Sequence, residues 1–184
     1  MSSSNETAKK EAEREALYPF LDAYALATGQ RLELVEDGEN PDFICVRPIS
    51  EGTPVGVELA RITHGPIKAH WDRILDGKVE LEAFDAQALV FELIGRKEEA
   101  RATRYVQRVK DCMLVLQLED GSLHHVRHAL DGLESDFKDH GFSEIWIADY
   151  SGLDAYGNVE LYGLYPAKYW GFHERPNHDS KPYG

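Results

Sequence analysis

An almost unbroken apolar run at residues 112–118 constrains the fold of this chain more than any other feature. Its one strongly polar member is Gln117, and such a run is typical of a central strand that is buried on both faces. A strand of this kind needs cover on each side of its sheet, which helices supply in α/β proteins. The length of 184 residues suits one domain with a substantial core.

The periodicity of apolar residues and the positions of turn residues predict the elements around this run. Helices are expected over residues 6–28, 84–110 and 126–139, with a short one through Trp71 and Ile74, and strands over residues 31–35, 41–46, 55–62, 112–118, 144–149 and 159–164. We expect residues 1–5 to be disordered and the last twenty residues to form an irregular tail. This order predicts an α/β fold with a mixed central β-sheet flanked by helices, in a single domain spanning residues 1–184.

Charge and composition narrow the function classes. The net charge is −13, with 33 acidic residues against 20 lysines and arginines. This charge argues against a broad basic surface that binds nucleic acid. The charge does not exclude a small basic channel or a metal-bridged contact with phosphate. No apolar run approaches the roughly 18 residues of a membrane span, and residues 1–6 lack the apolar core of a secretory signal. Cys45 and Cys112 lie in apolar strands, so we expect buried free thiols and a cytoplasmic location.

Two acidic residues stand in the two strands of a predicted hairpin, where a half-buried strand is normally apolar. Asp42 lies near the start of the first strand and Glu58 lies within the second. If the strands pair, the two carboxylates can converge on one divalent metal ion. Alternation places Gly56, Glu58 and Ala60 on one face, and these small neighbours leave space for a metal and a substrate. A solvent-exposed sheet edge is the alternative.

The long helix expected over residues 84–110 carries a lysine in its apolar stripe. Lys97 follows Leu89 and Leu93 at spacings of four. A lysine there either extends its ammonium group to solvent or meets a buried carboxylate, because a lone buried charge is costly. Beside two carboxylates it could stabilise charge on a phosphate or position an attacking water. Arg101, one turn further along, is a candidate phosphate contact, with a solvated arginine as the alternative.

Pro41 and Asp42, followed by a hairpin and then Glu58, Leu59 and Ala60, resemble the PD-(D/E)XK nuclease superfamily, the restriction-endonuclease-like fold. The resemblance implies a core of helix, three strands, helix and strand (αβββαβ) over about residues 10–118, with a C-terminal elaboration over about residues 119–184. It also implies that Asp42 and Glu58 bind Mg²⁺ or Mn²⁺. The implied activity is hydrolysis of phosphodiester bonds in nucleic acid, with DNA favoured over RNA as the substrate.

The chain departs from the superfamily pattern at the third position. The superfamily places a lysine two residues after the second acid, whereas this chain has Ala60 there, and Arg61 points by alternation to the opposite face. Some branches carry the lysine on the following helix instead, and Lys97 is the corresponding candidate. Many members add an acidic residue on the first helix. Glu13 fits that position best and Glu15 is the fallback, with a solvated acidic helix start as the alternative.

Other signals are better explained by structure than by chemistry. The histidines within residues 124–128 lack a further ligand at a spacing that zinc sites use, so we expect surface histidines. A group of aromatic side chains near the C-terminus could stack on bases, but we expect it to form an apolar cover over the sheet. This group consists of Tyr162, Tyr165, Tyr169 and Trp170.

The leading hypothesis is therefore a Mg²⁺- or Mn²⁺-dependent endonuclease whose site consists of Asp42, Glu58, Lys97, Glu13 and the substrate contact Arg101. One alternative is a catalytically inactive module of the same fold that acts in binding or interaction, which the missing lysine and the acidic net charge favour. Another is an interaction protein of a different α/β fold, which a structure with Asp42 and Glu58 far apart would reveal. No membrane partner is expected, and the oligomeric state is open, with a homodimer as one alternative.

Overall fold

The computed structural model describes residues 2–49, 52–62, 83–104, 109–119, 130–138, 140–150 and 159–173. Their helices and strands are, in chain order, α1 (Ser2–Thr28), β1 (Glu33–Asp37), β2 (Phe43–Arg47), β3 (Thr53–Arg61), α3 (Ala83–Arg104), β4 (Asp111–Leu118), β5 (Glu144–Asp149), β6 (Glu160–Tyr165), the 3₁₀ turn η1 (Ala167–Tyr169) and β7 (Gly171–His173). Among these residues, no helix is both long and apolar enough to cross a membrane.

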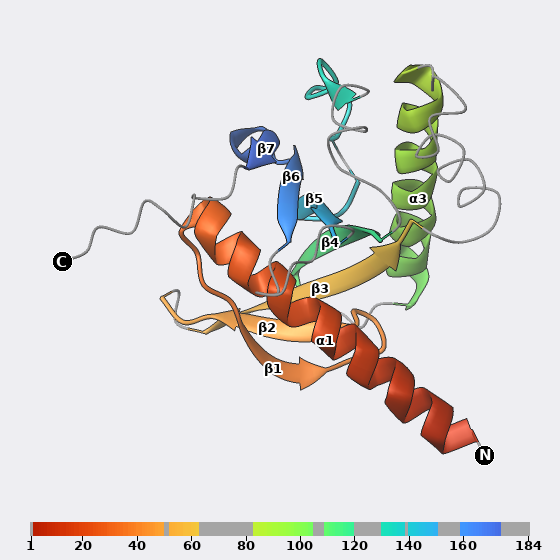
Figure 1. The fold of residues 1–184 in the computed structure, drawn as a ribbon, viewed down its shortest axis with the longest axis vertical. Helices are drawn as coiled ribbons and strands as arrows, with labels where there is room; N and C mark the ends of the chain where they lie inside the picture. Colours follow the sequence, from red (N-terminus) through yellow and green to blue (C-terminus); the bar gives the residue numbers. More distant parts are fainter. Residues whose placement is uncertain are drawn as a thin grey trace.

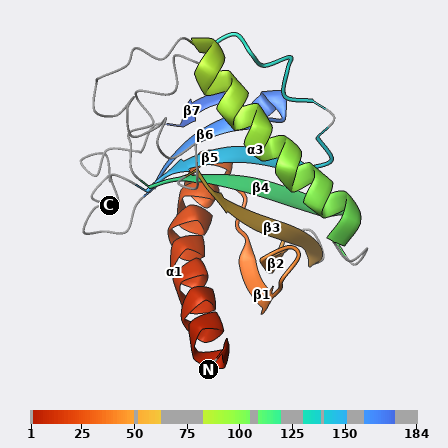
Figure 2. The same cartoon turned by 90° about the vertical axis from the view of Figure 1, so that its right-hand side faces the viewer.

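All of these strands form one seven-stranded sheet, and their spatial order follows their order in the chain. Strands β3, β4 and β5 run parallel, whereas the other neighbouring pairs run antiparallel. The predicted α/β class with a mixed sheet is therefore confirmed. Figure 1 shows α1 crossing one side of the sheet, and Figure 2 shows α3 covering the other side. Strands β5, β6 and β7 extend the sheet beyond the region of the expected nuclease-like core.

Strand β4 is the central strand that its apolar run predicts. Met113 and Val115 belong to the core beneath α1, whereas Leu114 and Leu116 belong to the core beneath α3. All four side chains are fully buried. Full burial of a side chain of this size contributes about 1.5–3 kcal/mol, so covering both faces of β4 is a principal reason for the two helical layers.

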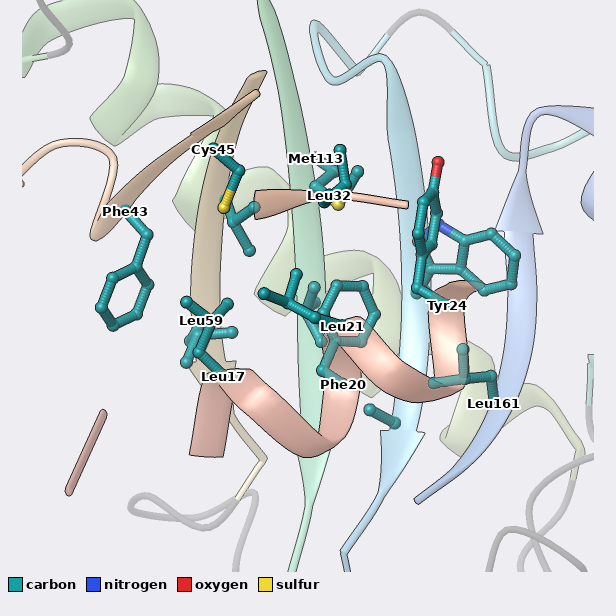
Figure 3. Packing of buried hydrophobic residues seen from close by; sticks show 14 of the residues in the cluster. Leu17, Phe20, Leu21, Tyr24, Leu32, Phe43, Cys45, Leu59, Met113 and Leu161 are labelled. Atoms are coloured by element: carbon teal, nitrogen blue, oxygen red, sulfur yellow. The ribbon is translucent and has the colours of Figure 1, made fainter. Parts of the chain in front are cut away.

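Helix α1 is held on its face of the sheet by one apolar stripe. Leu17, Phe20 and Tyr24 are fully buried, at spacings of three and four residues. Figure 3 shows these side chains projecting from α1 toward the strands, where Leu59 of β3 and Met113 of β4 lie. The stripe fixes how α1 is rotated about its own axis, and therefore which residues its N-terminal half presents to the edge of the sheet.

Several element boundaries differ from those predicted. Helix α1 begins at Ser2, although residues 1–5 were expected to be disordered; once a helix is nucleated, each added residue gains one backbone hydrogen bond without needing a tertiary contact. Strand β2 begins at Phe43, so Asp42 precedes the strand instead of lying within it. Helix α3 ends at Arg104, and residues 105–108 lie outside the described residues.

The C-terminal part differs more from the prediction. Of the helix expected over residues 126–139, residues 131–138 contain no helix, and Gly132 adopts a φ of 85°, a left-handed value that ends a right-handed helix. The expected irregular tail instead contains η1 and β7, because β7 pairs with β6. The predicted short helix through Trp71 and Ile74 and the histidines of residues 124–128 lie outside the described residues.

Candidate functional site

Glu58 is a buried acid on an otherwise apolar strand. Within β3, Val57 and Leu59 face the core beneath α1, so alternation turns Glu58 and Ala60 toward α3. Only 4% of Glu58 is exposed to solvent. A carboxylate this deeply buried requires hydrogen-bond donors or a cation, because its desolvation is otherwise costly.

Lys97 supplies a cation to Glu58 from the facing helix. Its Nζ donates a hydrogen bond of 2.6 Å to Glu58 Oε1, across 39 positions of sequence. The lysine follows Leu93 on the buried stripe of α3, and 28% of its side chain is exposed. The apolar stripe therefore holds the ammonium group over β3, where it meets a buried carboxylate, one of the two alternatives that its position predicted.

Asp42 completes a pair of carboxylates. Its backbone amide donates to Glu58 Oε2 at 3.3 Å, and its Oδ2 accepts a hydrogen bond of 2.9 Å from the amide of Leu59. The two acids lie one residue beyond the Phe43–Val57 pair of the β2–β3 ladder, so the hairpin register brings them together. Asp42 and Glu58 therefore lie together, without the separation that would have revealed an interaction protein of a different α/β fold.

The electrostatic environment of Asp42 is dominated by burial and by other acids. The pKa of its carboxyl group is raised to about 6, mainly by burial and also by the nearby Glu58 and Glu13, whereas the Leu59 amide and Lys97 oppose the rise. The rise therefore reflects first the cost of desolvating the carboxylate and second the repulsion by neighbouring acids. A pKa raised in this way is typical of carboxylates at sites that bind a cation or move a proton.

Glu13 lies at the periphery of this pair. It projects from α1, where it forms ion pairs with Lys9 at 3.4 Å and Lys10 at 3.2 Å. It acts on Asp42 through space, but within the described residues no three acidic, histidine or cysteine side chains converge into a metal-binding group. The fallback candidate Glu15 is exposed on α1. Glu13 therefore fits an auxiliary position better than that of a direct ligand.

A cavity of about 520 Å³ opens beside the acids, at the carboxyl ends of the parallel strands β3 and β4. Its walls come from the N-terminal half of α1 and from α3, and its floor comes from β3 and β4. The described residues that line it are Lys9, Ala12, Glu13, Leu59, Ala60, Arg61, Leu93, Arg96, Lys97, Ala100 and Gln117. Ligands of open α/β sheets commonly bind at this end of the strands.

Arg101, the predicted substrate contact, does not line the cavity. Its guanidinium group lies 5.2 Å from the ring centroid of Phe142 and donates a hydrogen bond of 3.0 Å to the carbonyl of Lys110. The cavity is instead lined by Arg61, which alternation argued against as a replacement for the missing lysine, and by Arg96, which no signal in the sequence indicated. Arg61 reaches it from the last position of β3, where strand alternation no longer confines a long side chain to one face.

The side chains of the site fit a hard divalent cation. Asp42 and Glu58 offer only oxygen atoms, which Mg²⁺ and Mn²⁺ prefer over the nitrogen and sulfur ligands of zinc sites. Mg²⁺ is commonly held by one or two carboxylates, with water and substrate phosphate as the other ligands. The two acids could hold such an ion. Lys97, which is hydrogen-bonded to Glu58, would then lie beside the ion.

Comparisons with known proteins identify no family. No family model matches the chain, and no curated protein matches it. One solved structure with some similarity is the central domain of yeast acetyl-CoA carboxylase, with a TM-score of 0.33 and 13% sequence identity. The alignment covers 84% of this chain but 26% of the other. A similarity this weak establishes neither a shared fold nor a shared function.

Proposed function

We propose that this protein is a metal-dependent nuclease of the restriction-endonuclease-like type, which hydrolyses phosphodiester bonds in nucleic acid, with DNA favoured over RNA. The observation that carries the proposal is the contact between Lys97 and Glu58, 2.6 Å long, immediately beside Asp42. Two carboxylates and a lysine that lines the neighbouring cavity are the minimum set for hydrolysis of a phosphodiester with the help of a metal ion.

Each side chain has a role in the proposed reaction. Asp42 and Glu58 would hold Mg²⁺ or Mn²⁺, which when bound lowers the pKa of water and neutralises phosphate oxygens. Lys97 would stabilise the charge that develops on the phosphate, because its ammonium group is held by Glu58 and its side chain is partly exposed. Glu13 would act as an auxiliary carboxylate that increases the negative potential around Asp42.

Two features support the restriction-endonuclease-like assignment. The described elements up to β4 follow the order of helix, three strands, helix and strand that the resemblance implies. Ala60 leaves the usual lysine position empty, and Lys97 reaches the second acid from the following helix. The lysine is thus available at the acids although its position in the sequence differs from the superfamily pattern.

A cleavage assay with labelled DNA and RNA tests the proposal. Purified protein should cut nucleic acid with Mg²⁺ or Mn²⁺ and stop when a chelator is added. Glu58→Ala should abolish cutting while the circular dichroism spectrum stays that of the parent. Equal cleavage by Glu58→Ala, or undiminished cleavage in the chelator, contradicts the assignment.

A catalytically inactive module that binds or interacts through the same fold is the second candidate. It is favoured because both oxygens of Glu58 already accept hydrogen bonds from the protein, and one oxygen of Asp42 does as well. The acidic net charge of −13 also fits a protein without a large nucleic-acid surface. Calorimetric titration with Mn²⁺ separates the two candidates, since only the nuclease requires binding that is lost in Asp42→Asn.

A further inference from the structure

The cavity beside the acids has a charge opposite to that of the whole chain. Among the described residues, its charged lining consists of four cations and one acid, namely Lys9, Arg61, Arg96, Lys97 and Glu13. The chain as a whole carries a net charge of −13. The carboxylates that pair with Arg61, Arg96 and Lys97 are not among the lining residues, so the charged groups that face the cavity are mainly cationic and favour an anionic ligand there.

The arginines of this lining are held only by weak pairs. Arg61 pairs with Glu119 at 3.1 Å, and their side chains are 42% and 35% exposed. Arg96 pairs with Glu92 at 3.9 Å, and both side chains are more than half exposed. Exposed pairs of this kind contribute little to stability, so phosphate oxygens can replace the carboxylates at small cost.

The rest of the lining is largely apolar, and this restricts the kind of anion. Ala12 on α1, Leu93 and Ala100 on α3, and Leu59 and Ala60 on β3 surround the interior. A base-paired duplex keeps the faces of its bases stacked, so it offers phosphates but no apolar surface for such a lining. An unpaired nucleotide offers both, because its base can enter an apolar pocket while its phosphates stay at the cationic rim.

We propose that the cavity between α1 and α3 binds an unpaired stretch of a nucleic-acid strand, with Arg61 and Arg96 on its phosphates and one base against Ala12 and Leu93. The volume of about 520 Å³ lies within the usual range of pockets for ligands of nucleotide size. This inference rests on the proposed function, because it supplies the substrate of the same site. Single strands, overhangs and unpaired junctions are then the substrates, and intact duplex is not.

Binding of labelled oligonucleotides tests the inference. Fluorescence anisotropy with a fluorescein-labelled DNA strand of about 12 nucleotides, within the usual site sizes, is measured in Mg²⁺ in a Glu58→Gln background that prevents cutting. The double change Arg61→Gln with Arg96→Gln should weaken binding about tenfold or more. It should also reduce the slope of log K against log salt concentration by about 1.4, which is about 0.7 for each lost phosphate contact. Arg31→Gln is the matched control, because Arg31 is also exposed and paired, with Glu33 at 3.6 Å, but lies outside the cavity.

A steric pair separates binding inside the cavity from attraction to its rim. Ala12→Trp fills the interior without changing charge and should weaken binding of the single strand severalfold. Ala8→Trp, one turn earlier on the same helix and also exposed, should have little effect because Ala8 does not line the cavity. The same DNA annealed into a blunt duplex should bind at least about tenfold more weakly than the single strand.

The outcomes distinguish this inference from the proposed function. It is overturned if no strand binds, if Arg31→Gln weakens binding as much as the double change, or if duplex binds as tightly as the single strand. If the cavity variants cut and bind like the parent, the nuclease assignment stands and the inference fails. If single strands bind through the cavity but nothing is ever cut, the inference stands and the nuclease assignment fails.

Discussion

Two buried glutamates on opposite faces of the sheet show how similar side chains can have different roles. Glu144, at the start of β5, accepts hydrogen bonds from Tyr24 at 3.0 Å, Arg47 at 3.1 Å and Trp146 at 3.0 Å. Glu58, on β3, also pairs with a basic side chain, Lys97. Both glutamates are almost fully buried, at 6% and 4% exposure, so burial alone does not distinguish them.

The difference lies in what surrounds each ion pair. Glu144 and Arg47 pair one charge against one, and two neutral donors use the remaining capacity of the carboxylate. Glu58 shares its single lysine with Asp42, whose pKa is raised, and the group adjoins a cavity. A saturated pair holds elements together, whereas an excess of acid beside open space can receive a cation. The comparison teaches that the local balance of charge, and not burial, identifies the candidate site.

The largest expected effect concerns catalysis. Glu58→Gln keeps the shape of the side chain but removes its charge, so cleavage should fall by about 10²–10³-fold or more. Glu144→Gln is the matched change at the other glutamate and should leave the cleavage rate of the folded protein within about threefold of the parent. Initial rates of cleavage measured well below the unfolding midpoint of each variant provide the test. Equal losses would remove the distinction between the two glutamates.

The next largest effect concerns stability, and here the larger loss is expected at the ion pair of Glu144 instead of that of Glu58. Arg47→Met leaves the charge of Glu144 without its cation in a closed interior, which should lower the free energy of unfolding by about 3 kcal/mol. Lys97→Met should lower it by about half as much, because the Asp42 amide remains bonded to Glu58 and the cavity admits water. Urea denaturation followed by tryptophan fluorescence measures both. A larger loss for Lys97→Met contradicts the comparison.

A metal ion should stabilise the protein through the acid-rich site alone. At a concentration of Mn²⁺ about 100 times its dissociation constant, the free energy of unfolding should rise by about 2.7 kcal/mol. Asp42→Asn should remove this gain, whereas Glu144→Gln should keep it. Thermal unfolding with and without Mn²⁺ measures the gain. A gain that survives in Asp42→Asn places the ion elsewhere.

The smallest effect is a gain in stability without metal. In the folded state the pKa of Asp42 is about 6, above the ordinary value of 3.8. Between these two pH values the folded state binds more protons than the unfolded state. The contribution of Asp42 to stability therefore falls as the pH rises from about 4 to about 6. Asp42→Asn removes the charged form and should stabilise the metal-free protein by about 1–2 kcal/mol at pH 7.

The gain from Asp42→Asn should shrink as the pH falls from about 6 and disappear below about 4, because the parent carboxyl is then protonated as well. Denaturation midpoints in chelator across this range measure it. Glu144→Gln, by contrast, should destabilise the protein at pH 7 because Arg47 loses its charged partner. A gain for Asp42→Asn that does not depend on pH would show that charge is not its cause.

Local pattern was enough to predict much of the framework. The apolar run of β4, the strand at residues 144–149 and the stripe of Leu17, Phe20 and Tyr24 are consequences of periodicity, which is legible without tertiary contacts. The same reasoning failed at Gly132 and at β7. A short edge strand depends on the partner strand that it joins, and a helix can be ended by a backbone conformation that composition does not reveal.

The candidate site, like the framework, could be predicted from the sequence only in part. The sequence by itself determined that Asp42, Glu58 and Lys97 were out of place in apolar surroundings, because the cost of burying a charge makes such residues conspicuous in a pattern. Only the tertiary structure decided that these three meet, that Arg101 packs on Phe142, and that Arg61 and Arg96 line a cavity. Those facts depend on hairpin register and on the packing of α1 and α3 against the sheet, which are set by contacts between residues far apart in the chain.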